Sequence, residues 1–527
     1  MTTLSKLRKE LDKKNISSQE LTKLYLDNIK KYDGKINSYI TVCEEFALES
    51  TKSAQAKIDK KESDAMTGIP ISIKDNICTK GIKTTCASKM LEDFVPVYNA
   101  TAVCKLLNQK AIILGKTNLD EFGMGDSNQN SYFGKVRNPY NTNCVSGGSS
   151  GGAAASVAAN LAPASLGTDT GGSVRQPAAL CGVTGIRPTY GTVSRFGLVA
   201  FASSLDQIGI CAKSANDAGY LLNSIYGQDP KDSTTSNNAT GNYLKLIGSS
   251  LKGLKIGVIK EFLAEIKSQD VKNNILSAID YFKKNNAEIL EVSLPSSKFG
   301  IGAYLAITSA EAVTNLSKFD GIKYGYNGGN FQFNESLKIS RTQAFGNEVK
   351  KRILLGNYVL SEENFEKCYI ASQNVRNKLI DEYKQIFEKC DVILSPTTLN
   401  TAQKFDFPGN IKQEYSQDIF TVNASLCGLP EITTTCGYDL NGLPIGFSLT
   451  GKPFDDATII AVADRFEQDF NRKEPILWNS FQLSDWKFMQ SFYQKRRFFA
   501  HVKINLAKNQ ILLSALCARE CLALFLF

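Results

Sequence analysis

Histidine is almost absent from this sequence, because His501 is the only one among 527 residues. Many serine hydrolases use an imidazole as general base, and hydrolytic zinc sites commonly take several histidines as ligands. A single histidine cannot build a zinc site of that kind. The sequence therefore excludes histidine-ligated zinc hydrolysis, and serine-based chemistry must take its base from another side chain or from His501.

Cysteine motifs, an apolar leader and long apolar runs are also missing. The 13 cysteines include no Cys-x-x-Cys pair, which is typical of small buried residues in a reducing compartment. The N-terminal stretch MTTLSKLRKELDKKN alternates charges, and residues 1–475 contain no run near the ~18 apolar residues of a membrane span. We therefore expect a cytoplasmic protein without a membrane partner, with an organellar matrix as the alternative compartment.

A phosphate-binding loop and a strongly basic body are missing as well. Gly115-Lys116-Thr117 matches the end of a Walker motif, but Lys110 occupies the position of its first glycine. The net charge is +9, and the last 52 residues alone carry seven Lys or Arg against two Asp or Glu. The body is thus close to neutral for its length, and charge gives no reason to expect that it binds nucleic acid by itself.

Two regions differ in composition. We expect residues 1–475 to form one domain, because no low-complexity linker divides them. Residues 476–527 hold both tryptophans and end in the apolar run ILLSALCARECLALFLF. We interpret them as a C-terminal extension of unknown role, either a lineage-specific addition or a reading-frame artefact, with a membrane or partner helix as the alternative.

The body alternates patterns typical of strands and helices. Five short apolar runs are typical of buried strands: 68–77, 111–119, 253–259, 287–294 and 391–397. Amphipathic periodicity at 271–286 and 362–390 predicts helices between the later runs. Ser17 followed by Glu20 predicts a capping box at the start of another helix. The alternation predicts an α/β protein built in layers.

One stretch is rich in the smallest residues: VSGGSSGGAAASVAANLAPASLGTDTGGSVRQPAAL, residues 145–180. A flexible linker is the simplest interpretation of so much glycine and serine. The run AAASVAANLA after GGSSGG consists of good helix formers, however, and a linker would not continue into so closely packable a helix. We therefore favour a catalytic loop, in which small residues let a substrate approach the backbone.

Residues 147–151 match G-x-S-x-G, the nucleophile elbow of α/β-hydrolases. That class requires a histidine base, and only His501 in the extension is available, so we do not favour it. A lysine is the remaining base near neutral pH, because burial lowers its pKa and the neutral amine accepts a proton. Lys74, at the polar end of the run 68–77, is the candidate; the alternative is a solvated surface lysine.

A second group of glycines lies in ASLGTDTGGSVRQPA, where a strand precedes a glycine turn. The successive backbone N–H groups of Thr170, Gly171, Gly172 and Ser173 can point into one concavity there. Such a set of donors suits the oxyanion of a tetrahedral intermediate. The turn is therefore a candidate oxyanion hole.

These segments resemble the amidase signature family. Residues 147–191 carry the likeness, which extends over about 4–475. Lys74, Ser149 and Ser173 occupy the positions of the family's Lys–cis-Ser–Ser triad, with Ser149 held by a cis peptide bond to Gly148. The resemblance implies an α/β fold with a large, mixed and twisted β-sheet covered by helices on both faces.

Within the family, NLDEFGMGDSNQNSYFGKVRNPYN and EVKKRILLGNYVLS are similar to glutaminase subunits of tRNA-dependent amidotransferases. By that likeness Ser173 attacks the side-chain amide of glutamine, Ser149 relays the proton to neutral Lys74, and the 170–173 backbone holds the oxyanion. Partner subunits B and C then use the ammonia to convert Glu-tRNA(Gln) to Gln-tRNA(Gln). We expect ATP and Mg²⁺ at a partner subunit, and no cofactor or metal in this chain.

The same likeness assigns three residues to the substrate. Arg352 matches the position that binds the α-carboxylate of glutamine, Asp418 the one that faces the α-ammonium group, and Tyr304 the one that lines the pocket. For each alone, a surface or structural role is the alternative, and Asp169 and Arg175 can simply pair to brace the loop. A free-standing amidase for another small amide and a catalytically silent scaffold remain the alternative functions.

Overall fold

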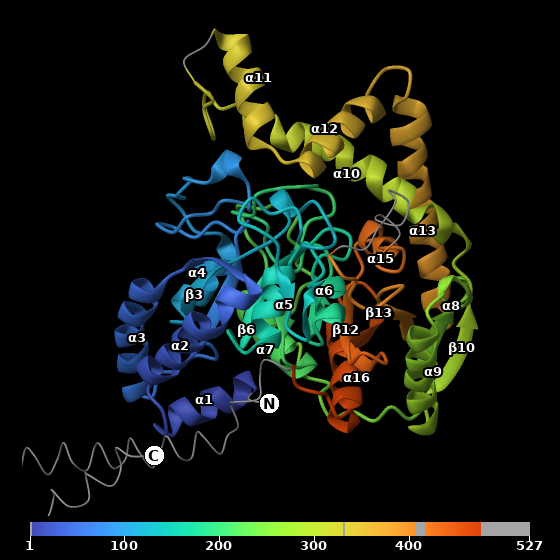
Figure 1. The fold of residues 1–527 in the computed structure, drawn as a ribbon. Coiled ribbons are helices and arrows are strands. Elements are labelled where there is room, and N and C mark those ends of the chain that lie inside the picture. Colours follow the sequence, from blue (N-terminus) through green and yellow to red (C-terminus); the bar gives the residue numbers. More distant parts are fainter. Residues whose placement is uncertain (1–2, 330–331, 406–416, 476–527) are drawn as a thin grey trace, which may run out of the picture. The chain divides into compact units, whose positions relative to one another are not determined.

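A computed structural model describes residues 3–329, 332–405 and 417–475 (Figure 1). Its centre is a sheet of 11 strands in the order β1-β3-β2-β6-β8-β7-β12-β13-β11-β9-β10, beside a ribbon of β4 and β5. The strands are β1 (Tyr39–Val42), β2 (Pro70–Lys74), β3 (Ile112–Thr117), β4 (Arg137–Asn138), β5 (Asn141–Val145), β6 (Ala164–Asp169), β7 (Thr184–Arg187), β8 (Gln207–Ala212), β9 (Lys255–Ile259), β10 (Glu288–Val292), β11 (Val392–Pro396), β12 (Glu431–Tyr438) and β13 (Pro444–Gly451). The predicted extension, 476–527, lies outside the described residues.

Helices surround the sheet. The α-helices are α1 (Leu4–Asp12), α2 (Ser18–Ile36), α3 (Glu44–Asp59), α4 (Thr101–Asn108), α5 (Gly151–Ala158), α6 (Arg175–Leu180), α7 (Ala215–Ile225), α8 (Lys260–Glu265), α9 (Gln269–Lys284), α10 (Gly300–Leu316), α11 (Phe333–Ala344), α12 (Asn347–Val359), α13 (Ala371–Phe387), α15 (Val422–Leu426) and α16 (Asp456–Asp469). Short 3₁₀ turns are η1 (Lys89–Leu91), η2 (Glu121–Gly123) and η3 (Pro295–Phe299), and η4 (Glu366–Ile370) is a π-helical turn ahead of α13.

The sheet is mixed. β2 runs parallel to its neighbours β3 and β6, and β9 runs parallel to β10 and β11. The strands from β6 to β11 pair antiparallel in between. Every residue of β2, β6, β7, β8, β11 and β13 is buried, so helices and loops cover both faces. The expected α/β fold with a large mixed sheet is confirmed.

The local predictions also hold in most places. All five apolar runs contain strands, and 271–286 falls largely on α9. The capping box is present, because the Ser17 hydroxyl accepts from the Glu20 N–H at 3.1 Å and the Glu20 carboxylate accepts from the Ser17 N–H at 2.8 Å. The helix predicted at 362–390 differs at its start, where the π-helical turn η4 precedes the regular α13.

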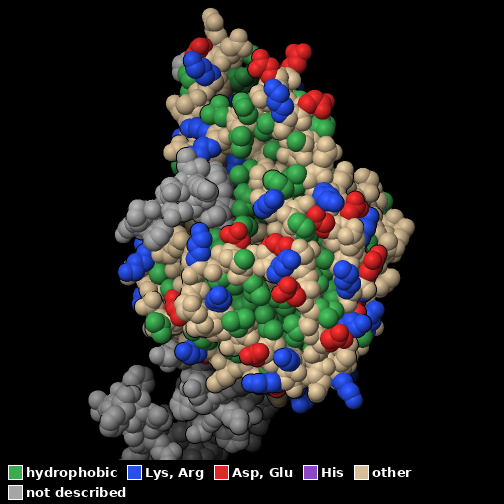
Figure 2. All heavy atoms as spheres, turned by 90° about the vertical axis from the view of Figure 1, so that its right-hand side faces the viewer, with side chains coloured by type: hydrophobic (Ala, Val, Ile, Leu, Met, Phe, Trp, Pro, Cys, Tyr) green, Lys and Arg blue, Asp and Glu red, His purple; other side chains and the backbone are tan. Residues whose placement is uncertain are grey.

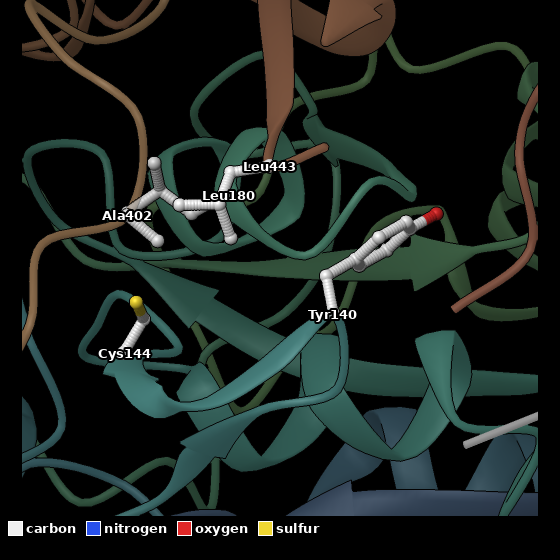
Figure 3. Packing of buried hydrophobic residues seen from close by; sticks show 5 residues of the cluster. All are labelled: Tyr140, Cys144, Leu180, Ala402 and Leu443. Carbon is white, nitrogen blue, oxygen red and sulfur yellow. The ribbon is translucent and has the colours of Figure 1, made fainter. Parts of the chain in front are cut away.

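The glycine- and serine-rich stretch is not a linker. It begins at the last residue of β5 and contains α5, β6 and α6. Helix α5 packs against β2, β6 and β8, and α6 packs against β7, β12 and β13. At the end of α6, Leu180 packs into a buried cluster with Tyr140, Cys144, Ala402 and Leu443 (Figure 3). The loop before α6 is thus anchored by strand β6 on one side and a packed helix on the other.

The surface carries charges of both signs. On the face in Figure 2, basic and acidic side chains are interspersed around apolar areas. Within the described part of the chain, no helix is both long and apolar enough to cross a membrane.

Candidate active site

Lys74 ends β2 in the interior and is 0% exposed, so the surface alternative for this lysine is wrong. Its Nζ lies 2.8 Å from Ser149 Oγ, 2.8 Å from Ser150 Oγ and 3.3 Å from the Thr168 carbonyl oxygen. All three neighbours are uncharged. The amine is thus held by three oxygens in a site that water does not reach.

The protonation state of this amine follows from its surroundings. Burial lowers the pKa of Lys74 to about 7, and the charges of Asp120 and Asp169 only partly oppose this effect. A pKa near 7 keeps a large fraction of the amine neutral at physiological pH. Lys74 is therefore suited to accept a proton from Ser149.

Ser149 and Ser150 stand where the chain turns into α5. The peptide bond between Gly148 and Ser149 is cis, as the family resemblance implied. The Ser150 N–H donates to the Ser173 carbonyl oxygen at 2.9 Å, which joins this turn to the second glycine loop. Sequence reasoning missed the contact of Ser150 with Lys74, although its place beside Ser149 was the available signal.

Asp120 is a second residue that sequence reasoning left without a role. Its backbone N–H donates to the Ser149 carbonyl oxygen at 3.2 Å, and its carboxylate accepts from the N–H groups of Asn128 and Asn130 at 2.9 and 3.1 Å. Burial raises the pKa of Asp120 to about 6, although these two hydrogen bonds oppose the shift. A Cβ at Gly148 would lie 2.1 Å from Asp120 Oδ2, so only glycine fits there.

The second glycine loop spans residues 170–173. Among the described residues, none accepts a hydrogen bond from these four backbone N–H groups. Gly172 has a φ of +149°, which few residues besides glycine adopt. The predicted oxyanion hole requires unpaired donors of this kind beside a buried serine, and Ser173 is 7% exposed. The assignment itself stays a prediction.

A buried ion network braces this loop. Arg175 contacts Asp169 at 2.8 Å and Glu431 at 2.6 Å, and Arg187 contacts Asp169 at 3.4 Å. Burial alone would raise the pKa of Asp169, but the two arginines outweigh it and hold that pKa well below its usual range. The expectation that Asp169 and Arg175 pair to brace the loop is confirmed.

The three predicted substrate residues lie together. Tyr304 of α10, Arg352 of α12 and Asp418 line one pocket, which is also lined by Gly125, Asp126, Phe201, Ile301, Leu305, Glu348 and Val422. The pocket adjoins the loop: a Cβ at Gly171 would lie 2.6 Å from the Tyr304 ring, and one at Gly172 3.1 Å from Asp418 Oδ1. The structure thus places both sets of predicted residues in one site.

The pocket holds charges of both signs. Arg352 Nε donates to Glu348 Oε1 at 2.8 Å, and the arginine is 5% exposed. Burial raises the pKa of Asp418 to about 7, Asp169 adds to the shift, and Arg175 and Arg352 oppose it. Asp418 Oδ1 is buried and accepts no hydrogen bond from any described residue. The pocket therefore contains an unpartnered oxygen acceptor together with the Arg352 guanidinium.

Comparison with known proteins identifies the family. The family model named Amidase matches residues 20–460. The chain belongs to the amidase family. Its arrangement explains the elbow-like motif at 147–151: the base within reach of Ser149 is Lys74, whereas His501 lies outside the described residues.

Several relatives of this amidase are similar over nearly their whole length. The A subunit of glutamyl-tRNA(Gln) amidotransferase from Ruminiclostridium cellulolyticum is 50% identical over 89% of this chain and 98% of its own. The protein of the same name from Neisseria meningitidis is 44% identical, over 90% and 99%.

Solved structures agree with the fold. The A subunit of glutamyl-tRNA(Gln) amidotransferase from Thermotoga maritima superposes with a TM-score of 0.73 at 36% identity, over 87% of this chain and 94% of its own. A peptide amidase from Stenotrophomonas maltophilia has a TM-score of 0.77 at 28% identity, over 90% and 98%. Proteins of similar fold thus bear the names of different activities, so the substrate must be argued from this chain's own pocket.

Proposed function

We propose that this amidase hydrolyses glutamine and supplies the ammonia to a tRNA-dependent amidotransferase. The observation that carries the proposal is the pocket beside residues 170–173, which presents a buried arginine and a buried carboxylate together. Free glutamine carries one carboxylate and one ammonium group next to the side chain that ends in the amide. The relatives at 44% and 50% identity bear the name of a glutamyl-tRNA(Gln) amidotransferase, which supports a role in amidating glutamyl-tRNA(Gln).

In the proposed reaction Ser173 Oγ attacks the carboxamide carbon of glutamine. Ser149 takes the proton of Ser173 and passes its own to neutral Lys74, 2.8 Å away. The N–H groups of 170–173 donate to the oxyanion, and removal of one such donor in comparable enzymes costs ~3 kcal/mol. Lys74 returns the proton through Ser149 to the nitrogen as the C–N bond breaks, and ammonia leaves. Water then hydrolyses the glutamyl ester on Ser173 by the same proton route.

Recognition of the amino-acid end falls to α10, α12 and Asp418. Arg352 binds the α-carboxylate, for which a guanidinium has the fitting fork of donors. Asp418 accepts from the α-ammonium group through its unpartnered Oδ1. Tyr304 forms the wall against Gly171. A zwitterionic amino acid can pair with both side chains at once, whereas a neutral amide can pair with neither as an ion.

Partners complete the reaction. The chain supplies ammonia to subunits B and C, which use ATP and Mg²⁺ to convert Glu-tRNA(Gln) to Gln-tRNA(Gln) in a cytoplasmic complex. Residues 1–475 form the glutaminase, and the chain itself holds no cofactor.

The test compares glutamine with 4-aminobutanamide, which is glutamine without its α-carboxylate. The purified chain should release ammonia from both amides, alone and with its partner subunits. We expect kcat/KM for glutamine to be about 100-fold higher than kcat/KM for 4-aminobutanamide. Equal values for the two amides would favour the free-standing amidase instead, to which the similarity with a peptide amidase points. No release from either would favour the silent scaffold.

A further inference from the structure

Residues 120–125, DEFGMG, join the serine side of the site to helix α12. At one end, the Asp120 N–H donates to the Ser149 carbonyl oxygen at 3.2 Å. At the turn η2, a Cβ on Gly123 would lie 3.6 Å from Ser149 Oγ. Between these two contacts with Ser149 stands Glu121, which the proposed mechanism does not use. Its side chain points to a different part of the molecule.

Glu121 holds the start of α12. Its Oε2 accepts from the Gly346 N–H at 2.7 Å, and its Oε1 accepts from the Ser88 hydroxyl. The side chain is 3% exposed, and a Cβ at Gly346 would lie 2.4 Å from Oε2, so the fit is close. A carboxylate at this end of a helix is also favoured by the helix dipole.

The first two turns of α12 carry the cationic side of the pocket. Gly346 is the N-cap of the helix, Glu348 lies in its first turn, and Arg352 follows one turn later. The hydrogen bond between Glu348 and Arg352, 2.8 Å, runs along the same face. A displacement at Gly346 therefore moves the guanidinium relative to Ser149 and Ser173.

A second contact, made by the Phe122 ring, also connects residues 120–125 to the start of α12. Phe122 has a φ of +52° and is 2% exposed. Its ring lies 5.8 Å from that of Phe345, the residue before Gly346, and 5.2 Å from that of Phe319. The hydrogen bond of Glu121 and the ring contact of Phe122 thus both reach residues 345–346.

We propose that Glu121 is a positioning residue for glutamine: it fixes the start of α12 and so sets the distance between Arg352 and the reacting serines. This inference rests on the proposed function. It assigns Glu121 to the recognition of the α-carboxylate, through Arg352, and to no step of proton transfer.

The charge on Glu121 is not the essential property. Burial raises the pKa of Glu121 to about 7, although the hydrogen bonds of Ser88 and Gly346 and the charge of Lys350 oppose the shift. Glutamine in its place keeps the length and one oxygen acceptor for Gly346. Glu121→Gln should therefore stay close to wild type, whereas Glu121→Ala loses the acceptor and Glu121→Asp is too short to reach Gly346.

The experiment measures ammonia release from glutamine and from 4-aminobutanamide by the chain with its partner subunits. In Glu121→Ala, KM for glutamine should rise about tenfold while kcat stays within about twofold. The values for 4-aminobutanamide should hardly change, because this amide lacks the carboxylate that Arg352 would bind. Glu121→Asp should raise KM for glutamine by a smaller factor. This variant tests the proposal if the alanine variant does not fold.

Asp456 provides a matched control. It is also a buried carboxylate that accepts from one backbone N–H and one hydroxyl, both of Thr189, at 2.9 and 2.7 Å, but it lies at the start of α16. Asp456→Ala should lower thermal stability and leave KM for glutamine unchanged.

Three results would overturn the inference. In the first, Glu121→Ala lowers kcat on both amides equally, which indicates a general structural role. In the second, KM is unchanged in Glu121→Ala and Glu121→Asp alike. In the third, wild type hydrolyses 4-aminobutanamide as well as glutamine; the proposed function then fails, and the inference fails with it.

Discussion

The two halves of the site are built differently. The half that holds Lys74, Ser149 and Ser173 comes from β2 and from two short loops whose ends enter buried strands and helices. The half that holds Tyr304, Arg352 and Asp418 comes from α10, α12 and the segment before α15, and α10 and α12 pack on each other (Figure 1).

This difference separates chemistry from selection. The first half is fixed by backbone hydrogen bonds and by the ion network of Asp169, Arg175 and Glu431. The substrate-binding half depends on the positions of helices α10 and α12. The hydrogen bond from the Gly346 N–H to Glu121, at the start of α12, is an example. Amide hydrolysis can thus be shared across a family while the helices decide which amide is hydrolysed. Variants of the first half should change kcat, and variants of the second should change KM.

The largest effect is expected at Lys74. Lys74→Met removes the base and should lower kcat for glutamine by about 10⁴-fold, the loss typical of a member of a catalytic unit. The measurement is steady-state ammonia release at saturating glutamine.

Lys116 on the neighbouring strand β3 is the matched control for this variant. It is equally buried, and its amine contacts Ile77, Thr84 and Asp75 instead of the serines. Lys116→Met should cost stability, since it leaves the Asp75 carboxylate without its cation, but folded protein should keep kcat. An equal loss of kcat in both variants would mean that the loss comes from damage to the strands and not from removal of the base.

The next largest effect is expected at Arg352. Arg352→Met should raise KM for glutamine about 100-fold, because a buried charge contact with the substrate is lost. KM for 4-aminobutanamide should not change. Arg376→Met serves as control: that arginine, on α13, donates to the Leu426 carbonyl oxygen at 2.7 Å and does not line the pocket. If Arg352→Met lowered kcat by a larger factor than it raised KM for glutamine, Arg352 would act in the reaction itself, with Lys74 and the two serines.

The pH profile of kcat should show a single group with a pKa of about 7. Neutral Lys74 is the active form, so activity is complete above this pKa and is lost as the pH falls through it. Below pH ~6 kcat should fall about tenfold per pH unit. Saturating glutamine separates this effect from Asp418, whose protonation would raise KM instead. A kcat that is flat from pH 5 to 8 would exclude Lys74 as the base.

A small effect is expected at Thr421, which connects the two halves. Its hydroxyl donates to the Gly171 carbonyl oxygen at 2.6 Å. Thr421→Val should lower kcat by a factor of about three and the free energy of unfolding by about 1 kcal/mol.

Thr51→Val removes a hydroxyl bond of the same length, to the Leu48 carbonyl oxygen on α3, and should change stability alone. An unchanged kcat in Thr421→Val would show that the loop keeps its position without this bond.

The sequence allowed one half of the site to be predicted more fully than the other. Lys74 was a candidate base because histidine is scarce and this lysine ends an apolar run, and the glycine turn at 170–173 indicated an oxyanion hole. The roles of Ser149 and Ser173 came from the family resemblance. Arg352 and Asp418 were found only through the family resemblance, because no local pattern marks them.

Long-range contacts outside the triad and the substrate residues were not predicted. Glu121 reaches Gly346 across 225 positions of the chain, and Thr421 reaches Gly171 across 250. Such pairs depend on how α12 and α15 pack on α10, and nothing local to either residue encodes them. The contact of Lys74 with Ser150 was missed for a smaller reason: the motif offered two adjacent serines, and only the geometry shows that the amine touches both.

The central claim is that Ser173 releases ammonia from glutamine for use by a partner in the complex. The most direct measurement compares wild type with Ser173→Ala in the assembled complex, following both ammonia release and the amidation of Glu-tRNA(Gln). We predict that the variant loses glutamine-dependent release and amidation and that added ammonium restores amidation. Retained glutamine hydrolysis in Ser173→Ala would contradict the account.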